Sequence, residues 1–571
     1  MRGLLIGNQE SAINNCIGLR NSRKSSLMTS RTRADILLIA GFCGFLFFYG
    51  LAQFGLIGAD EPRYAQVARE MLARRDWVTP ILNGKPWLEK PPLYYWQAML
   101  AFAAFGVTDW AARLPSAFDG TAMVVAVYLF FRRYHAAVAL DAALISASCA
   151  GVIAYARAAS MDMALAATFA VAMLAWWTWK DSGRKAWLAV FYIALALGTL
   201  AKGPVAPLLA GLMLAVYCIL RGEFRRLVRT LWLPGIALFC FITLPWYVAV
   251  QIRNPSFFQQ FILQHNLARF SSDLYHHREP FWYYFPVTAI ALMPWVVFAI
   301  AACIPAVRIY LRSRKSGSGH ELDFRIFAFC WLIVPVLFFS ISQSKLPGYI
   351  LPAVPAGTII LADYLREWQE SKQPDNPSKW LIVLHAVLAS APFVPALLLA
   401  YIVTQHRMPG GRPMLIALGA AFILFAGIAV TLSSRAGLRM LRFVTLIPVL
   451  LSVAAVLKIG APSLDQALSA RPLARELASI EVHPLPLAVY GVPRELEYGL
   501  NFYRDQPIPR YEWGGIPAQE HLLIAPADWQ AGVAKYTAGR RVSFLGHYTA
   551  QRLDYYWVSA ARPVPDHPAA R

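Results

Sequence analysis

Acidic side chains stand where apolar segments of this sequence end. Asp60 and Glu61 follow the first hydrophobic run, and Asp162 lies in the nearly apolar stretch ARAASMDMAL. An ionisable side chain in such a stretch is costly to bury, so it usually faces a cavity or an oppositely charged partner. We expect Arg157 to be the partner of Asp162. Such carboxylates can serve as bases or stabilise developing positive charge, although each one alone could equally be a solvated helix cap.

Cationic side chains have a matching placement. Lys202 lies in TLAKGPVAP and Lys345 in SQSKLPGYILP, both in tight turns, and Arg63 and Lys90 are expected on the same side of the membrane. A single lysine near a helix end often only extends its amine to the interface. Four cations on one face, beside Gly-Pro or Pro-Gly breaks, favour a binding site for a lipid phosphate.

One segment, QHNLARFSSDLYHHREPFWYYFP, combines histidines with aromatic residues. Its aromatic residues are explained by anchoring at the membrane interface. Its histidines could ligate a divalent metal, Zn²⁺ being the expected ion, together with Glu89 or Asp60. His265 is the best candidate, because the adjacent His276 and His277 lack the spacing of a local zinc motif. Any metal site must therefore be assembled in space.

Several function classes are excluded by what the sequence lacks. It has no P-loop, no dinucleotide fingerprint and no nucleophile elbow, so nucleotide-driven pumping is unsupported. The net charge of +21 does not predict nucleic-acid binding, because much of the Lys and Arg lies in short clusters between apolar runs. The seven cysteines imply neither a disulfide framework nor a cysteine metal site.

The elements that must position these groups are membrane helices. Hydrophobic residues make up 58% of the 571, mean hydropathy is +0.46 and only 15% are charged. Arg31 and Arg33 before the first span place the amino terminus in the cytoplasm and Asp60 outside. About thirteen spans of roughly 20 residues each are expected: 35–55, 112–131, 137–156, 163–180, 187–201, 204–220, 231–250, 284–307, 324–342, 349–365, 379–403, 413–433 and 442–459.

The predicted fold is a mainly α polytopic membrane protein with a small exported α/β domain. Residues 1–34 form a cytoplasmic extension, although the chain could begin at Met28; residues 35–459 form the transmembrane region, and 460–571 the exported domain. The run 93–107 is short for a span and conflicts with the charge pattern. We interpret it as an interfacial or half-inserted helix, with a tilted span as the alternative.

The motifs in combination resemble a known superfamily. An acidic pair after the first span, EKPPLYYW, WAARLPSA and Asp162 in the second exported loop are similar to the membrane glycosyltransferases of the GT-C fold, within the protein O-mannosyltransferase superfamily. QHNLARF, HREPFWYY and SKLPGYILP resemble most the bacterial 4-amino-4-deoxy-L-arabinose transferases that modify lipid A. The resemblance covers roughly residues 35–360, and the remainder matches only in general layout.

The resemblance implies a reaction and roles for the residues. The donor would be undecaprenyl phosphate-linked aminoarabinose and the acceptor a phosphate of lipid A, at the periplasmic side of the bacterial inner membrane, and the product would confer resistance to polymyxin. By the resemblance Asp60 is the principal catalytic carboxylate and Asp162 a second essential acid. The donor phosphate would be held by Arg63, Lys90, Lys202, Lys345 and Tyr349. We expect a monomer that binds membrane lipids.

Two alternatives stay open. An enzyme of the same fold could glycosylate serine or threonine hydroxyls of proteins, using a polyprenyl-phosphate sugar. A hydroxyl acceptor needs a base, whereas a phosphate is already anionic, so the two differ in the role of Asp60. A polytopic lipid transporter or flippase would also account for the spans and the lysines, but no inverted repeat is visible.

Overall fold

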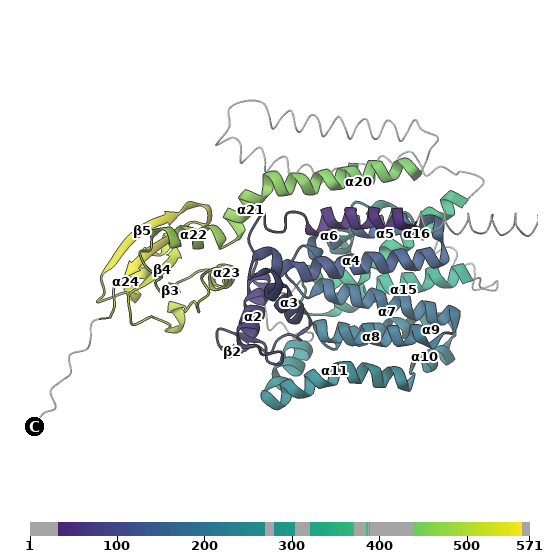
Figure 1. The fold of residues 1–571 in the computed structure, drawn as a ribbon, viewed down its shortest axis with the longest axis horizontal. Coiled ribbons are helices and arrows are strands. Elements are labelled where there is room, and N and C mark those ends of the chain that lie inside the picture. Colours follow the sequence, from purple (N-terminus) through teal and green to yellow (C-terminus); the bar gives the residue numbers. More distant parts are fainter. Residues whose placement is uncertain are drawn as a thin grey trace, which may run out of the picture.

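A computed structural model describes residues 32–268, 279–302, 320–370, 384–385, 387–388 and 438–561. Long helices lie side by side, and a small domain containing a β-sheet lies at one end of the bundle (Figure 1). The expected extension 1–34 falls almost wholly outside the described residues, as do the expected span 413–433 and most of 379–403.

The described residues confirm a multi-span membrane protein. Within the described ranges, six helices are long and apolar enough to cross a membrane, or up to nine if each of three bent pairs is one span. The expected number of thirteen is therefore not confirmed. The unbroken spans are α4 (Asp109–Tyr134), α7 (Asp162–Ser182), α8 (Lys185–Lys202), α11 (Leu233–Arg253), α15 (His320–Ile341) and η5 (Pro347–Ala353) continued by α16 (Val354–Glu370). The helix α9 (Val205–Arg221) is apolar but shorter.

Two spans expected to be continuous are broken and meet at their breaks. The first consists of α5 (Ala139–Ser148) and α6 (Ala150–Ala156), with a bend of 64° between them. The second consists of Phe281–Ala291, which contains α13 (Tyr284–Ala291), and Val296–Ala302, with a bend of 112° between them. The Ala150 amide donates to the Met293 carbonyl at 2.8 Å. Backbone groups released at a break inside a membrane need such partners, because lipid offers none. The paired breaks leave irregular backbone beside a cavity.

Two short helices lie at the end of the bundle that faces the small β-containing domain (Figure 1). The segment that begins at Asp60 forms α2 (Asp60–Arg74), and the run 93–107 forms α3 (Leu93–Phe105). The 13 residues of α3 span about 20 Å at 1.5 Å per residue, too short for a membrane core of about 30 Å. Aromatic rings of Tyr64, Tyr94 and Tyr95 pack the two helices together.

The C-terminal residues form the small α/β domain expected from the sequence. Its four-stranded sheet has the order β3-β4-β6-β5, with β3 parallel to β4 and the other pairs antiparallel. The strands are β3 (Leu487–Val489), β4 (His521–Pro526), β5 (Val542–Tyr548) and β6 (Leu553–Val558). The helices are α21 (Ala461–Leu468), α22 (Arg471–Ile480), α23 (Arg494–Arg504) and α24 (Gln530–Tyr536). The long helix α20 (Leu438–Ala455), followed by η6 (Val456–Gly460), leads into it.

Basic connections gather at the opposite end of the bundle, around α10 (Phe224–Thr230) (Figure 1). Lys180 Nζ lies 3.3 Å from an Asp323 carboxylate oxygen and 3.5 Å from one of Glu223, and Arg221 lies 2.5 Å from Asp323. These largely buried ion pairs tie the ends of α7 and α9 to α15. Asp323 therefore neutralises two cations at a point where three helices meet.

Replacing Asp323 by Asn should destabilise the bundle, because Lys180 and Arg221 would lose a shared anion. Breaking a buried pair on one side costs on the order of 3 kcal/mol. We expect a clearly lower thermal unfolding midpoint of the purified protein in detergent. Asp181→Asn is the control, because its bond to Tyr134 is exposed. Equal midpoints for the two variants would contradict this role of Asp323.

Candidate active site

The two carboxylates of the acidic pair point in different directions. Glu61 is 6% exposed, and it accepts hydrogen bonds from Arg113 Nε at 3.1 Å and Nη2 at 2.7 Å. It also accepts from the backbone amides of Ile57 at 2.8 Å and Ala159 at 2.7 Å. Asp60 has a half-exposed side chain that pairs with Arg63 and lines a cavity. Glu61 is thus a structural anchor, and Asp60 is the acid available for chemistry.

Arg113 of α4 ties together the chain that precedes Asp60. Besides Glu61, its guanidinium donates to three backbone carbonyls: Leu51 at 2.8 Å, Phe54 at 2.8 Å and Gly55 at 2.9 Å. The side chain is only 1% exposed. A buried charge is tolerated when its partners are complete, and every donor placed here has an acceptor. The position of Asp60 therefore depends on the pair formed by Glu61 and Arg113.

Asp162 is held by Lys202, and the expected partner Arg157 is a wrong prediction. Asp162 begins α7, Lys202 ends α8, and their side chains form an ion pair. Ser160 Oγ lies 3.3 Å from Asp162 Oδ2. Arg157 instead donates to the carbonyls of Leu46 at 3.0 Å and Tyr49 at 2.9 Å. Two antiparallel helices with a short connection bring the first residue of one beside the last of the other, which explains the pairing.

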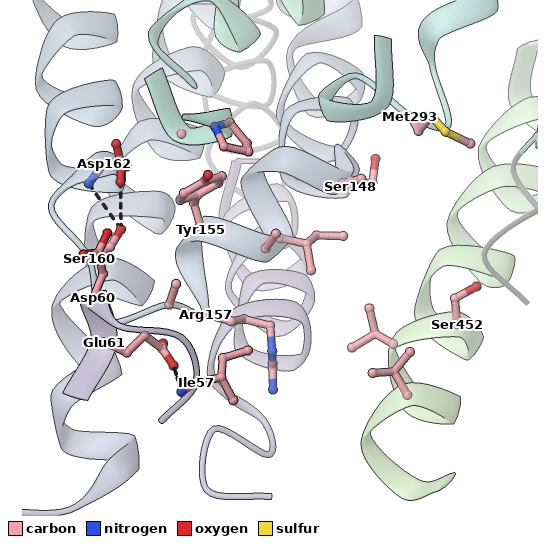
Figure 2. Close-up of a pocket in the computed structure, with 18 of the residues that line it drawn as sticks. Ile57, Asp60, Glu61, Ser148, Tyr155, Arg157, Ser160, Asp162, Met293 and Ser452 are labelled. Carbon is pink, nitrogen blue, oxygen red and sulfur yellow. Dashed lines mark hydrogen bonds between the residues drawn. The ribbon is translucent and has the colours of Figure 1, made fainter. Parts of the chain in front are cut away.

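The two acids open into one cavity of about 610 Å³. Figure 2 shows Asp60 and Asp162 on one side and Ser452 of α20 across from them. Most of the remaining lining is apolar and includes Ile153, Val453 and Leu457. Burial, and to a smaller extent the charge of Arg113, lowers the pKa of Arg157 to about 10, so this lining residue stays protonated at neutral pH.

A second cavity of about 360 Å³ lies on the other side of Lys202. Its polar lining includes Lys90, Lys202, His265 and Tyr349, and its apolar walls come from Leu165, Leu208, Ile262, Phe338 and Phe339. The Tyr349 ring centre lies 4.5 Å from Lys202 Nζ, and Tyr349 lines both cavities. The cationic cavity and the acidic cavity therefore adjoin at Asp162, Lys202 and Tyr349.

A glycine allows this close approach. A Cβ on Gly348 would lie 2.8 Å from the carboxyl carbon of Asp162 and 2.8 Å from Tyr155 Oη. Carbon atoms in proteins do not come that close without one of them moving. Gly348 lies in η5, directly before Tyr349, so its lack of a side chain lets this segment reach Asp162.

Two of the predicted phosphate ligands have other contacts. Arg63 pairs with Asp60 and stacks over the rings of Tyr64, Trp87 and Tyr498, with centroid distances of 5.1, 5.2 and 5.4 Å. Lys345 is buried and donates to the carbonyls of Ser342 at 2.6 Å and Glu279 at 3.0 Å. Within the part of the chain that the structure describes, neither side chain lines the two cavities. Their role as phosphate ligands stays a prediction.

The proposed metal ligands lie near each other but do not complete a site. His265 Nε2 is 3.7 Å from Glu89 Oε1. No group of three or more His, Cys, Asp or Glu suited to a metal occurs in the described ranges, and His276 and His277 fall outside them. Zinc takes four ligands in structural sites and three protein ligands in catalytic ones. The two described ligands are too few for either kind of site, so the zinc site stays a prediction and no step of the chemistry is assigned to a metal.

The sequence contained an unused signal for the Glu61–Arg113 pair. WAARLPSA places Arg113 in an apolar context, where an arginine needs an anion. Glu61 was predicted as part of the acidic pair but received no role of its own, because Asp60 was expected to be the functional acid.

Comparisons with known proteins found a matching family and similar sequences. Residues 42–261 match the family described as dolichyl-phosphate-mannose-protein mannosyltransferase. An undecaprenyl phosphate-alpha-4-amino-4-deoxy-L-arabinose arabinosyl transferase of Pseudomonas fluorescens is 32% identical over 334 residues, which cover 57% of this chain and 58% of that protein. The one of Serratia proteamaculans is 32% identical over 317 residues, with 54% and 55% covered. The match thus spans little more than half the length of these relatives.

A solved structure matches over a longer range. The crystal structure of ArnT from Cupriavidus metallidurans bound to undecaprenyl phosphate covers 93% of this chain and 99% of its own, with a TM-score of 0.73 and 24% identity. Its apo state gives 0.70 and 23%. This likeness confirms the expected GT-C fold with a small C-terminal domain. The chain is therefore similar in sequence to aminoarabinose transferases and has the fold of one of them.

Proposed function

We propose that this protein is a membrane glycosyltransferase that moves 4-amino-4-deoxy-L-arabinose from undecaprenyl phosphate to a phosphate of lipid A. The observation that carries the proposal is the meeting of two largely apolar cavities, one cationic and one acidic, at Asp162, Lys202 and Tyr349. Transfer between two lipids needs room for both chains beside one polar centre. The names of the relatives and the undecaprenyl phosphate in the matching structure support this choice of donor.

The smaller cavity suits the donor. Lys90 and Lys202 would hold the phosphate, because charge-assisted bonds from ammonium groups are strong where water is excluded. The apolar walls would take the polyprenyl chain. Asp162 keeps Lys202 in place, so its role would be to orient this cation. Arg63 and Lys345 would contribute to the same electrostatic field from outside the cavity.

The larger cavity suits the acceptor. An oxygen of the lipid A phosphate would attack the anomeric carbon of the sugar while the bond from that carbon to the undecaprenyl phosphate oxygen breaks. The electron pair of that bond leaves with undecaprenyl phosphate, whose charge Lys90 and Lys202 stabilise. The attacking phosphate is already anionic and needs no base. Asp60 would bind the 4-amino group or stabilise an oxocarbenium-like transition state, and Arg157 would attract the acceptor phosphate.

The charge distribution supports a periplasmic site in the bacterial inner membrane. Basic connections gather at one end of the bundle, and the C-terminal domain lies at the other (Figure 1). The cavities belong to this second end, because Asp162, which lines one of them, begins α7, whereas Lys180 lies in the last turn of α7. Positive connections stay in the cytoplasm. The proposed enzyme acts as a monomer. Adding an amino sugar lowers the negative charge of lipid A, which would weaken its attraction for polymyxin and other cationic peptides.

A protein O-glycosyltransferase is the second candidate. The matching family is described by its transfer of mannose from dolichyl phosphate to protein. The half-exposed carboxylate of Asp60 could act as the base that a serine or threonine hydroxyl needs. Acceptor analysis separates the two functions, because they place the sugar on different molecules.

Lipid A analysis tests the proposed acceptor. Cells that lack their own aminoarabinose transferase and synthesise the donor should gain a pentosamine-sized addition on lipid A when they express this protein. Cells expressing Asp60→Ala at an equal protein level should not. Mass spectrometry of extracted lipid A gives the answer. Identical spectra from the two strains would remove lipid A from the proposal, and a sugar found on protein would favour the second candidate.

Kinetics of purified Asp60→Asn test the role of the carboxylate. We expect kcat to fall about 100-fold, because removing one preorganised electrostatic group costs roughly that much, while the KM for donor changes little. Asp505→Asn is the matched control: it makes the same change to an exposed carboxylate that pairs with Arg69. A normal kcat with a weakened donor affinity would show that Asp60 binds the donor and does not act on the transition state.

A further inference from the structure

We propose that the C-terminal domain positions Asp60 by clamping the loop in front of it, through Asp465, Arg471 and Tyr503. The inference rests on the proposed function, because it assigns these residues to the same active site. The loop, residues 51–57, connects the helical residues 32–48 to α2 and supplies Phe54 and Ile57 to the wall of the acidic cavity. In the described part of the C-terminal domain no residue lines that cavity. The domain therefore acts through the loop.

Two backbone amides of the loop are bound by the domain. Gly55 donates to Asp465 Oδ1 at 2.7 Å, and Leu56 donates to Tyr503 Oη at 2.6 Å. Buried backbone amides almost always have a partner, so these acceptors replace the ones a helix or sheet would provide. Burial and the adjacent Asp109 carboxylate raise the pKa of Tyr503, which keeps its hydroxyl protonated and able to donate as well.

Two carbonyls of the same loop are bound by one arginine of the domain. Arg471 Nη1 donates to Ala52 at 3.0 Å, and Nη2 donates to Gln53 at 3.3 Å. Arg471 is only 8% exposed, and its charge is neutralised by Asp465, 2.6 Å away, and Asp109, 2.7 Å away. Such a fully bonded buried guanidinium has a fixed direction. The domain thus binds four of the five loop residues from 52 to 56. The remaining one, Phe54, is bound by Arg113 of the bundle.

The clamp is anchored to the helix that holds the other side of the loop. Asp109 accepts from Arg471 and, at 2.6 Å, from Tyr503, and it is the first residue of α4. Arg113, one turn later on α4, binds the loop carbonyls of Phe54 and Gly55. The contacts from the domain and the contacts from Arg113 are therefore anchored on the same helix, α4. A shift of the domain would move the loop relative to Arg113.

Gly55 marks how closely the domain approaches. A Cβ at this position would lie 2.3 Å from Ser469 Oγ and 2.5 Å from Tyr503 Oη. A side chain there would have to displace the side chains of Ser469, Tyr503 or Arg471. The loop and the domain are therefore built to touch, five residues before the acid that the reaction needs. Preorganisation of this kind affects turnover, because a misplaced acid stabilises the transition state poorly.

The test uses full-length protein with Arg471→Gln, Tyr503→Phe and, as the matched control, Arg504→Gln. Arg504 forms a comparable buried pair with Glu481, 2.7 Å away, but makes no contact with the loop. We expect the first two variants to lower kcat about 10- to 100-fold with little change in the KM for donor. Their loop, residues 51–57, should exchange amide hydrogen for deuterium faster. The control should keep the kcat and loop exchange of the wild type.

Peptides from strands β4 and β6 report whether the domain itself stays folded. Slow exchange there, with fast exchange in the loop and a lowered kcat, supports the clamp. Normal turnover in both variants despite a loosened loop would overturn it, as would a lowered kcat with an unchanged loop. The exchange experiment needs no substrate. A wild-type protein without transferase activity would therefore contradict the proposed function, and loop exchange would still decide whether the clamp exists.

Discussion

The buried ion pair between Glu61 and Arg113 is the constraint on which the rest of the site depends. Arg113 gathers three loop carbonyls before Asp60, and Glu61 accepts the Ala159 amide three residues before Asp162. The pair therefore fixes two chain segments that are about a hundred residues apart in the sequence. Removing either charge would leave the other buried without its partner, which is more costly than never burying the pair.

The surrounding elements place this polar centre beside two cavities with largely apolar walls. The antiparallel helices α7 and α8 bring Lys202 to Asp162, and Gly348 lets η5 place Tyr349 against both cavities. The broken spans give the larger cavity irregular backbone, and α20 closes it with apolar side chains. Charged groups in a membrane are tolerated where they face one another or a cavity. The architecture satisfies this condition at one end of the bundle.

The features of the fold that depend on composition and charge could be predicted from the sequence. The contacts between residues far apart in the sequence could not. Apolar runs and basic clusters predicted the membrane fold, because burial in lipid leaves a strong compositional signal. The helix α2 was missed although Tyr64, Val67, Ala68 and Met71 have helical spacing and are buried. Arg157 was expected to pair with Asp162, whereas the pairing of α7 with α8 brings Lys202 to that carboxylate. The clamp joins residues some 400 positions apart, which one sequence cannot reveal.

A double-mutant cycle on Glu61 and Arg113 tests the central claim most directly. Turnover would be measured for purified Glu61→Gln, Arg113→Gln and the double variant, at equal amounts of folded protein. If the two residues act as one unit that holds Asp60 and Asp162 in place, each single change lowers kcat strongly and the double variant is no worse than either. Losses that multiply in the double variant, or a single variant with normal turnover, would contradict the account.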